Sequence, residues 1–370
     1  MNALLRAAGL SIAALGLLSG CNDDKTTAVT DAGVEDAGPN KALLGGKLGA
    51  AVAAAEANSG QAAAAKAPGD GPPEAGFFPP GGADKAQAPG APAKVELLGE
   101  GSEPRVLLTS APPAEQQATL LTGYRMGQQG SLPPFDFALA IKSSKGKDEK
   151  VDGAQVVAKV VSVDIPGAGG KLPKELTDGL DKLKGSEVRY RLTSDGAMLD
   201  LATSAPKDKD KAPNPEIAPM LDIAMRGLVE AMTLMTVPLP KKPVGVGGYW
   251  IATDRGTSFG IDVVRYRVFK VQKIEKDQVT LGVDTRQYAV KAEIDLGAIA
   301  QNQKMVADRF DSQGKGQITW LSAQALPVGS EVSQRTTVTF GGGPQGQPKG
   351  GLQVELAAKS AGAEKADKKK

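Results

Sequence analysis

Apolar and polar residues alternate one by one in many segments of the chain from about residue 95 onward. Such alternation is typical of β-strands with one buried face, because successive side chains of a strand point to opposite sides of the sheet. The segments follow one another closely and are joined by turn-forming residues, which favours an antiparallel meander over a parallel sheet. In the longest segment the alternation slips at Val263 and Val264, which predicts a β-bulge there. The predicted strands are 135–141, 157–165, 187–192, 197–201, 259–273, 279–283, 317–321, 332–340 and 352–356.

Two segments follow the helical period instead. Residues 173–184 begin with a proline, which suits the first turn of a helix, and set three leucines on one stripe. Residues 215–236 repeat apolar side chains at helical spacing, with a regular part expected from Pro219 and a stop at Pro238. The fold class expected is therefore mainly β with two helices (α+β): a curved antiparallel sheet or open half-barrel packed on the helices.

The second predicted helix is rich in methionine, a flexible side chain that adapts to irregular apolar surfaces. Its apolar stripe predicts either part of the packed core or the wall of a cavity for an acyl chain, and both readings stay open. Trp250 follows a turn rich in proline and glycine and is expected to anchor the core, with contact to a ligand as the alternative. The candidate residues for lining an apolar ligand are Met220, Leu221, Met225, Leu228, Met232, Met235 and Trp250.

Composition divides the chain into regions. Residues 1–20 are expected to be a signal peptide. Residues 21–94 consist mainly of small, polar and proline residues, which cannot bury enough apolar surface to fold, and they are predicted to form a disordered tether. Residues 95–357 are predicted to be a β-rich globular domain, and residues 358–370 a disordered, lysine-rich tail.

Charge and missing residue types narrow the function. The 44 basic and 42 acidic residues leave a formal charge of +2, which gives no reason to expect a nucleic-acid partner. The chain has no histidine and one cysteine, so the usual proton shuttle and the preferred zinc ligands are missing. Ser258 lies in a Gly-x-Ser-x-Gly sequence, but that motif needs a histidine base. We expect no catalytic residues, no metal and no cofactor, and hence no enzyme.

The N-terminus carries the most specific pattern. Arg6 precedes an apolar run over residues 7–18, which is too short to span a bilayer and is typical of a signal peptide. The run closes with Leu18, Ser19, Gly20 and Cys21. This closure resembles the lipobox of bacterial lipoproteins.

In that family the cysteine thiol receives a diacylglycerol, a signal peptidase recognises the three preceding residues and cuts before the cysteine, and the new amino group takes a further acyl chain such as palmitate. The resemblance implies a cell-envelope protein attached to a membrane through Cys21. The alternative is an ordinary secretory peptide with an incidental cysteine. In enteric bacteria, an aspartate directly after the acylated cysteine favours retention in the inner membrane. This chain has Asn22 at that position, which implies the outer membrane, on its periplasmic side or at the surface. Asp23 weakens that inference.

A second resemblance covers residues 95–357. Residues 238–250 read Pro-Leu-Pro-Lys-Lys-Pro-Val-Gly-Val-Gly-Gly-Tyr-Trp, and residues 314–316 lead through a strand to Leu326 and Pro327. Both features are similar to a family of β-rich bacterial lipoproteins without an assigned activity. The layout also resembles, more loosely, the LolA-type and LppX-type lipid carriers, which hold acyl chains between a curved antiparallel sheet and helices.

These patterns together predict a non-catalytic, membrane-anchored envelope lipoprotein that binds a lipid or another apolar ligand in a half-barrel. The alternative is a structural or adaptor lipoprotein that binds another envelope component. The sequence does not identify that protein partner.

Overall fold

The computed structural model describes residues 75–127, 131–145, 152–168, 172–206, 217–295, 304–340 and 350–362. Within them, one antiparallel sheet of 12 strands has the order β1-β7-β8-β9-β12-β13-β14-β2-β3-β4-β5-β6. Its strands are β1 (Lys94–Gly99), β2 (Glu115–Arg125), β3 (Phe135–Lys145), β4 (Ala154–Asp164), β5 (Glu187–Leu192), β6 (Met198–Ser204), β7 (Tyr249–Ser258), β8 (Ile261–Glu275), β9 (Gln278–Ala289), β12 (Arg309–Leu321), β13 (Glu331–Phe340) and β14 (Gly350–Gly362). A separate pair joins β10 (Glu293–Asp295) to β11 (Lys304–Val306). The expected mainly β class with an open antiparallel sheet is confirmed.

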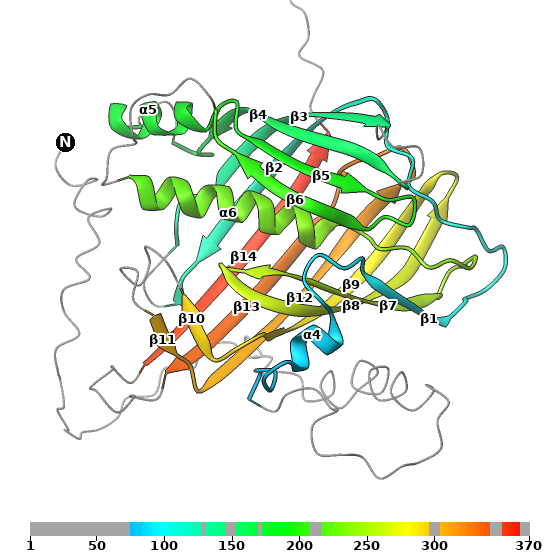
Figure 1. Cartoon of the computed structure of the whole chain (residues 1–370). Helices are drawn as coiled ribbons and strands as arrows, with labels where there is room; N and C mark the ends of the chain where they lie inside the picture. Colours follow the sequence, from blue (N-terminus) through cyan, green and yellow to red (C-terminus); the bar gives the residue numbers. More distant parts are fainter. Residues whose placement is uncertain are drawn as a thin grey trace, which may run out of the picture. The chain divides into compact units, whose positions relative to one another are not determined.

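The sheet consists of two meanders that meet in its middle (Figure 1). Strands β7 to β14 form one meander, and β2 to β6 form the other. They are joined where β14 pairs with β2, with Leu356 opposite Tyr124. Strand β1 adds to the outer edge of β7. The strand nearest the C-terminus thus holds the two halves of the sheet together.

The meander from β7 to β13 is strongly curved. The Ser258 hydroxyl at the end of β7 lies 3.0 Å from the Thr336 hydroxyl of β13, although β8, β9 and β12 separate these two strands in the sheet. Glycines at two successive inward positions of β12 permit this curvature. A Cβ at Gly314 would lie 2.1 Å from the side-chain oxygen of Gln334, and one at Gly316 would lie 2.4 Å from a backbone oxygen of β13.

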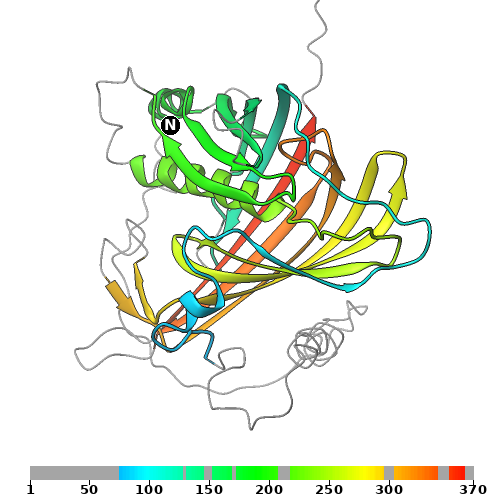
Figure 2. The same cartoon turned by 45° about the vertical axis from the view of Figure 1, so that its right-hand side comes forward.

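Helix α6 (Ala218–Met235) lies on the concave side of the sheet, and α5 (Lys174–Leu183) lies beside it against β4 (Figures 1 and 2). Both helices were expected at these positions. Gly227 lets α6 approach β2 closely, because a Cβ there would lie 2.9 Å from the Tyr124 ring. No helix among the described residues is long and apolar enough to cross a membrane.

The structure differs from the expected strands in several places. The predicted strands did not include β1, β7, β10 or β11, and β12 begins at Arg309 instead of residue 317. Strand β2 was not predicted, because its inward face includes Ala118 and Thr122 and therefore alternates only weakly in hydrophobicity. The bulge in β8 lies between Val271 and Lys273, so the prediction of a bulge at Val263 and Val264 was wrong. These two valines are both buried because Val263 faces the concave side, whereas Val264 pairs with Tyr288 on a face that Phe78 covers.

The described residues begin before the predicted domain boundary at residue 95. The segment 75–93 lies along the sheet and contains the short helix α4 (Gly82–Ala86). The Phe78 amide donates to the Ala289 carbonyl at 3.0 Å, and the Phe77 ring packs on that of Phe310. Strand β14 likewise continues beyond residue 357, to Gly362. The rest of the expected tether and tail lies outside the described residues.

The Pro/Gly-rich segment after α6 is joined to the loop that follows β1. The Gly245 amide donates to the Glu100 carbonyl at 2.8 Å, and Val244 and Val106 exchange two backbone hydrogen bonds of 2.9 Å. A Cβ at Gly245 would lie 1.7 Å from the Ser102 carbonyl oxygen. Glycine is therefore required by close backbone approach, and the loop pair 99–107 and 243–249 is held firmly at the edge of the sheet.

Candidate functional site: a buried polar belt beneath helix α6

The candidate apolar lining residues lie in the core or against it. Leu221, Leu228, Met232, Met235 and Trp250 are buried within one continuous apolar cluster. Met220 and Met225, nearer the N-terminal end of α6, are half-buried and pack against the same cluster. Their contact with a ligand remains a prediction. The lipidation residues Leu18, Ser19, Gly20 and Cys21 lie outside the described residues.

Trp250 fixes the point where the chain leaves α6 and enters β7. Its indole N–H donates to the Pro238 carbonyl at 2.8 Å. Its ring stacks on Phe269 of β8, with the ring centres 5.5 Å apart. The side chain is fully buried, as expected for a core anchor.

Sequence reasoning missed a row of buried polar side chains on the concave face. They come from β7, β8, β9, β12 and β13, and the strand register sets them side by side: Asp254 lies opposite Arg265, Arg265 opposite Gln287, and Gln287 opposite Ser312. None is more than 8% exposed. We call this row the polar belt; its members are Asp254, Ser258, Arg265, Arg267, Thr285, Gln287, Ser312, Gln334 and Thr336.

An ion-pair cluster forms one end of the polar belt. The two carboxylate oxygens of Asp254 accept hydrogen bonds from Arg265 and Arg267. Burial opposes ionisation of Asp254, but the two guanidinium groups outweigh it and hold the pKa of the carboxyl below its ordinary value. Arg265 also donates to the Thr233 hydroxyl of α6 at 2.9 Å. The carboxylate is thus fully engaged and is not available as a free base.

Arg267 completes the C-terminal end of α6. Its guanidinium donates to the carbonyls of Thr233 and Thr236 at 3.2 and 2.6 Å and lies over the Phe269 ring. The last carbonyls of a helix have no partners within the helix and carry a partial negative charge. Since the last turn of α6 contains no basic residue, a cation from β8 supplies the missing donors. Burial lowers the pKa of Arg267 from its ordinary value.

Glu230 connects α6 to the turn between β7 and β8. One carboxylate oxygen accepts from the Phe259 amide at 2.9 Å and from the Tyr124 hydroxyl at 3.2 Å. Phe259 has a positive φ of 51°, unusual for an aromatic residue, and its ring packs edge-on against Tyr124. Burial raises the pKa of the Glu230 carboxyl above its ordinary value, against the opposing effect of these hydrogen bonds.

Hydroxyl and amide groups form the other end of the polar belt. The Ser312 hydroxyl lies 2.7 Å from that of Thr336, accepts from the Gln334 amide at 2.8 Å and donates to the Gln287 side-chain oxygen at 3.2 Å. Three buried atoms in the belt have no protein partner among the described residues: Arg267 Nε, Gln287 Nε2 and Gln334 Oε1. The belt therefore retains hydrogen-bonding capacity that the described residues do not use.

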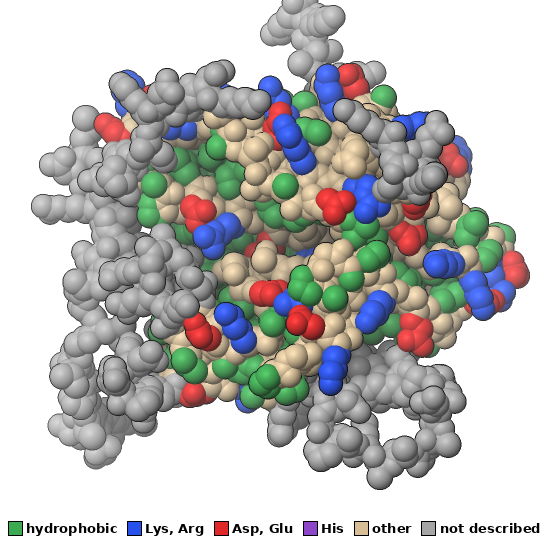
Figure 3. Space-filling model, in the orientation of Figure 1, with side chains coloured by type: hydrophobic (Ala, Val, Ile, Leu, Met, Phe, Trp, Pro, Cys, Tyr) green, Lys and Arg blue, Asp and Glu red, His purple; other side chains and the backbone are tan. Residues whose placement is uncertain are grey.

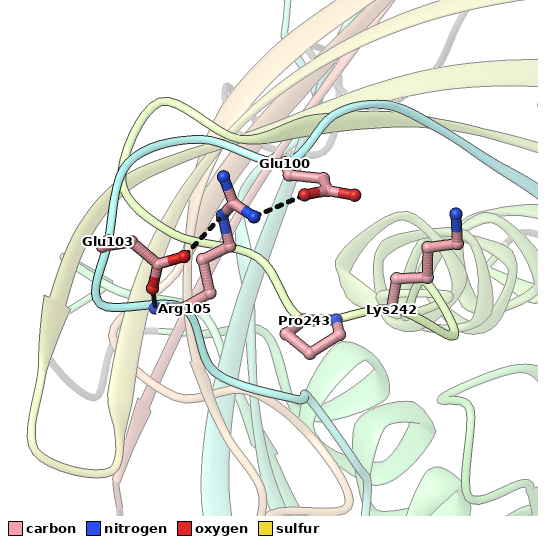
Figure 4. A pocket seen from close by; sticks show the side chains of 5 residues that line it. All are labelled: Glu100, Glu103, Arg105, Lys242 and Pro243. Atoms are coloured by element: carbon pink, nitrogen blue, oxygen red, sulfur yellow. Dashed lines mark hydrogen bonds and ion pairs between the residues drawn. The ribbon is translucent and has the colours of Figure 1, made fainter.

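The molecular surface over this region is hollowed. Figure 3 shows a depression between α6 and the end of the β7–β8 pair, with apolar side chains along its margin. A separate surface pocket of about 320 Å³ lies at the loop pair and is lined by Glu100, Glu103, Arg105, Lys242 and Pro243 (Figure 4). There Arg105 pairs with both glutamates in solvent, where ion pairs are weak.

The side chains of the polar belt are engaged mainly with one another. Its only acid, Asp254, is held between two arginines, and its hydroxyl groups bond to one another. The described residues contain no group of three His, Cys, Asp or Glu side chains able to hold a metal ion. No family model matches this chain, and no curated protein is significantly similar to it.

Removal of the Asp254 charge tests the ion-pair cluster. We expect Asp254→Asn to lower the free energy of unfolding by about 3–5 kcal/mol, because two buried guanidinium groups lose their counter-ion. Asp262→Asn is a matched control: it removes an exposed partner of Arg255, and its cost should stay below about 1 kcal/mol. Urea unfolding of the full chain measures both; equal costs would contradict a buried cluster.

Glu230 makes the free energy of unfolding depend on pH in a predictable direction. Because its pKa is raised in the folded state, its contribution to stability is largest below the ordinary value of 4.5 and declines as the pH rises through the folded-state pKa. Glu230→Gln keeps an acceptor oxygen but cannot ionise. The free energy of unfolding of the Glu230→Gln variant, relative to that of the wild-type protein, should therefore increase with pH.

The measurement is a series of urea unfolding curves between about pH 4 and pH 8. The exposed Glu275→Gln is the control and should give a nearly flat difference. A flat difference for Glu230→Gln would show that burial does not govern this carboxyl.

Proposed function

We propose that the protein is a non-catalytic lipoprotein of the bacterial cell envelope, attached to the membrane through an acylated Cys21, that holds a lipid or another apolar ligand between its curved sheet and α6. The resemblance of residues 18–21 to a lipobox supports the anchor. Two acyl signals give stable attachment, whereas one chain gives only marginal binding. The outer membrane is the favoured location because Asn22 follows the cysteine.

The observation that carries the ligand proposal is the unequal attachment of the two halves of α6. Its C-terminal half is tied to the sheet by hydrogen bonds involving Glu230, Thr233 and the last carbonyls. Its N-terminal half packs through apolar side chains, and its exposed charges Asp222 and Arg226 pair within the helix. Apolar contacts are non-directional, so they can be exchanged for contacts with an acyl chain at little cost.

The methionines suit this exchange. Met220 and Met225 lie half-buried on the less firmly held half of α6, and their side chains can repack around an irregular apolar guest. The fully buried Met232 and Met235 lie on the half that the polar belt fixes. A ligand would therefore enter beneath the N-terminal half of the helix.

An adaptor role is the second candidate, and the loop pair 99–107 and 243–249 favours it. Three large apolar side chains are exposed there: Leu107, Val246 and Tyr249. Because the loop pair is held firmly by backbone hydrogen bonds, it would present these side chains to a partner without a cost of ordering.

Cys21 is tested by labelling with radioactive palmitate in a bacterial host. The wild-type chain should incorporate label and fractionate with membranes, whereas Cys21→Ala should do neither, because the thiol is the acceptor of the first lipid. Asn22→Ala should still be labelled. Label in Cys21→Ala, or a mature chain that retains residue 1, would refute the anchor.

The ligand is tested by native mass spectrometry of the full chain after mild extraction. We expect one apolar molecule bound to each wild-type chain. The Leu221→Asp variant should lose this molecule, because the substitution places a charge beneath the N-terminal half of α6. Leu107→Asp is the control because that side chain is already 55% exposed. A wild-type protein free of ligand, with a discrete partner on crosslinking, would instead establish the adaptor.

A further inference from the structure

The loop pair 99–107 and 243–249 carries half of the large apolar side chains that are exposed in the described part of the chain. Leu107 is 55% exposed, Val246 is 45% exposed and Tyr249 is 36% exposed. The other three lie singly on β4, β6 and β11. Removal of an apolar side chain from water is favourable, so a surface that gathers three of them gains most from a nonpolar contact.

Backbone hydrogen bonds hold two of these side chains outward. The Val246 carbonyl accepts from the amide and from the hydroxyl of Ser102, at 2.9 and 3.1 Å. Leu107 follows Val106, which packs against the core and exchanges two backbone hydrogen bonds with Val244. Neighbouring side chains of an extended segment point in opposite directions, so Leu107 faces solvent. The loops need no ordering before they meet another surface, which lowers the cost of binding.

The third side chain, Tyr249, lies beside free positive charge. It is opposite Lys270 of β8, which is exposed. Lys241 and Lys242, which directly precede the second loop, are exposed as well. None of these three lysines forms an ion pair with a described residue. Tyrosine, with an apolar ring and a polar hydroxyl, suits the interface between membrane and water, and lysine is attracted to anionic lipid there.

The acidic residues of the loop pair do not cancel this charge. Glu100 and Glu103 are both paired with Arg105, and Figure 4 shows Lys242 apart from these pairs. Arg105 and the three lysines give four basic side chains against two acidic ones, a net charge of +2. The surface thus combines exposed apolar side chains with a net positive charge.

This combination fits a bilayer better than it fits a protein partner. Apolar side chains can insert at the level of the lipid head groups while lysines contact anionic lipids. Protein interfaces are depleted in lysine, and their binding energy is concentrated in a central, well-packed region. Here the apolar side chains stand separately on two loops, and the pocket at the loop pair is lined mainly by charged residues.

The length of the chain allows this contact. Residues 22–74 connect Cys21 to the first described residue, and 53 residues can span up to roughly 180 Å. That reach lets any face of the domain meet the bilayer. We propose that the loop pair docks on the anionic phospholipid surface of the membrane and thereby orients the anchored domain. This inference rests on the membrane attachment proposed above and specifies a second contact with the bilayer.

A tryptophan at position 107 reports the contact. The full chain is reconstituted on vesicles of brominated phosphatidylcholine, with or without phosphatidylglycerol, because bromine quenches a tryptophan that reaches the acyl chains. Trp250 and Trp320 are buried and give the background. We expect strong quenching of Leu107→Trp on vesicles that contain phosphatidylglycerol. Val161→Trp is the matched control and should stay at the background level, because Val161 is also 55% exposed but lies on β4, in the other meander.

Removal of positive charge tests the electrostatic part of the contact. In the Leu107→Trp chain, Lys241→Gln together with Lys242→Gln should lower the ratio of docked to undocked protein by about thirtyfold. Lys159→Gln together with Lys359→Gln is the control. Both of these lysines are exposed on strands of the sheet, and the pair changes the net charge equally, so the quenching should persist.

Flotation of the vesicles reports membrane attachment separately. Attachment to both vesicle types without extra quenching at position 107 would overturn the docking, leave the acylated anchor standing and return the loop pair to the adaptor role. Equal quenching on both vesicle types, or quenching unchanged by loss of Lys241 and Lys242, would overturn the anionic surface as the partner. Attachment only to vesicles with phosphatidylglycerol, with quenching at position 107, would overturn the anchor and support the docking. Attachment to neither vesicle type would overturn both proposals.

Discussion

The contact between Arg267 and the C-terminal end of α6 fixes the architecture. A helix with few charges lies across a curved sheet, and its unpaired carbonyls must find donors in a buried region. Arg267 supplies them from β8, and the Asp254 carboxylate pairs with both Arg267 and Arg265. The position of α6 along the sheet is thus set by directional bonds at one end, whereas apolar packing alone would allow it to slide.

Sequence periodicity predicted most strands and both long helices, because each of those signals is local. Prolines delimited α6, with Pro219 in its first turn and Pro238 after its end. The missed strand β2 has Ala118 and Thr122 at inward positions, so the contrast between its faces is weak. The polar belt was not predictable: its members extend from Asp254 to Thr336 and become neighbours only through the register of five strands. Arg265 and Arg267 lie on the inward face of β8 and are buried there.

A polar belt inside an apolar core is costly compared with a core of the same shape made of leucine and valine. The belt makes the packing geometry specific, because its directional hydrogen bonds fix the register of β12 against β13 and the angle at which the β7–β8 turn meets α6. The apolar core around it supplies cohesion. The combination divides the concave face into a part near Glu230 that hydrogen bonds fix and a part near Met220 that packs through apolar contacts alone, and the proposed entry of an apolar ligand beneath the N-terminal half of α6 follows from that division.

The pairing of β14 with β2 has a consequence for biogenesis. Residues near position 356 must meet residues near position 124 before the two meanders form one sheet. Contacts between such distant parts of a chain form slowly. While the last strand is still being synthesised, the earlier meanders lack the neighbour that completes them. For the proposed exported lipoprotein this order of assembly would be useful, because the complete sheet cannot form before its last strand has been synthesised.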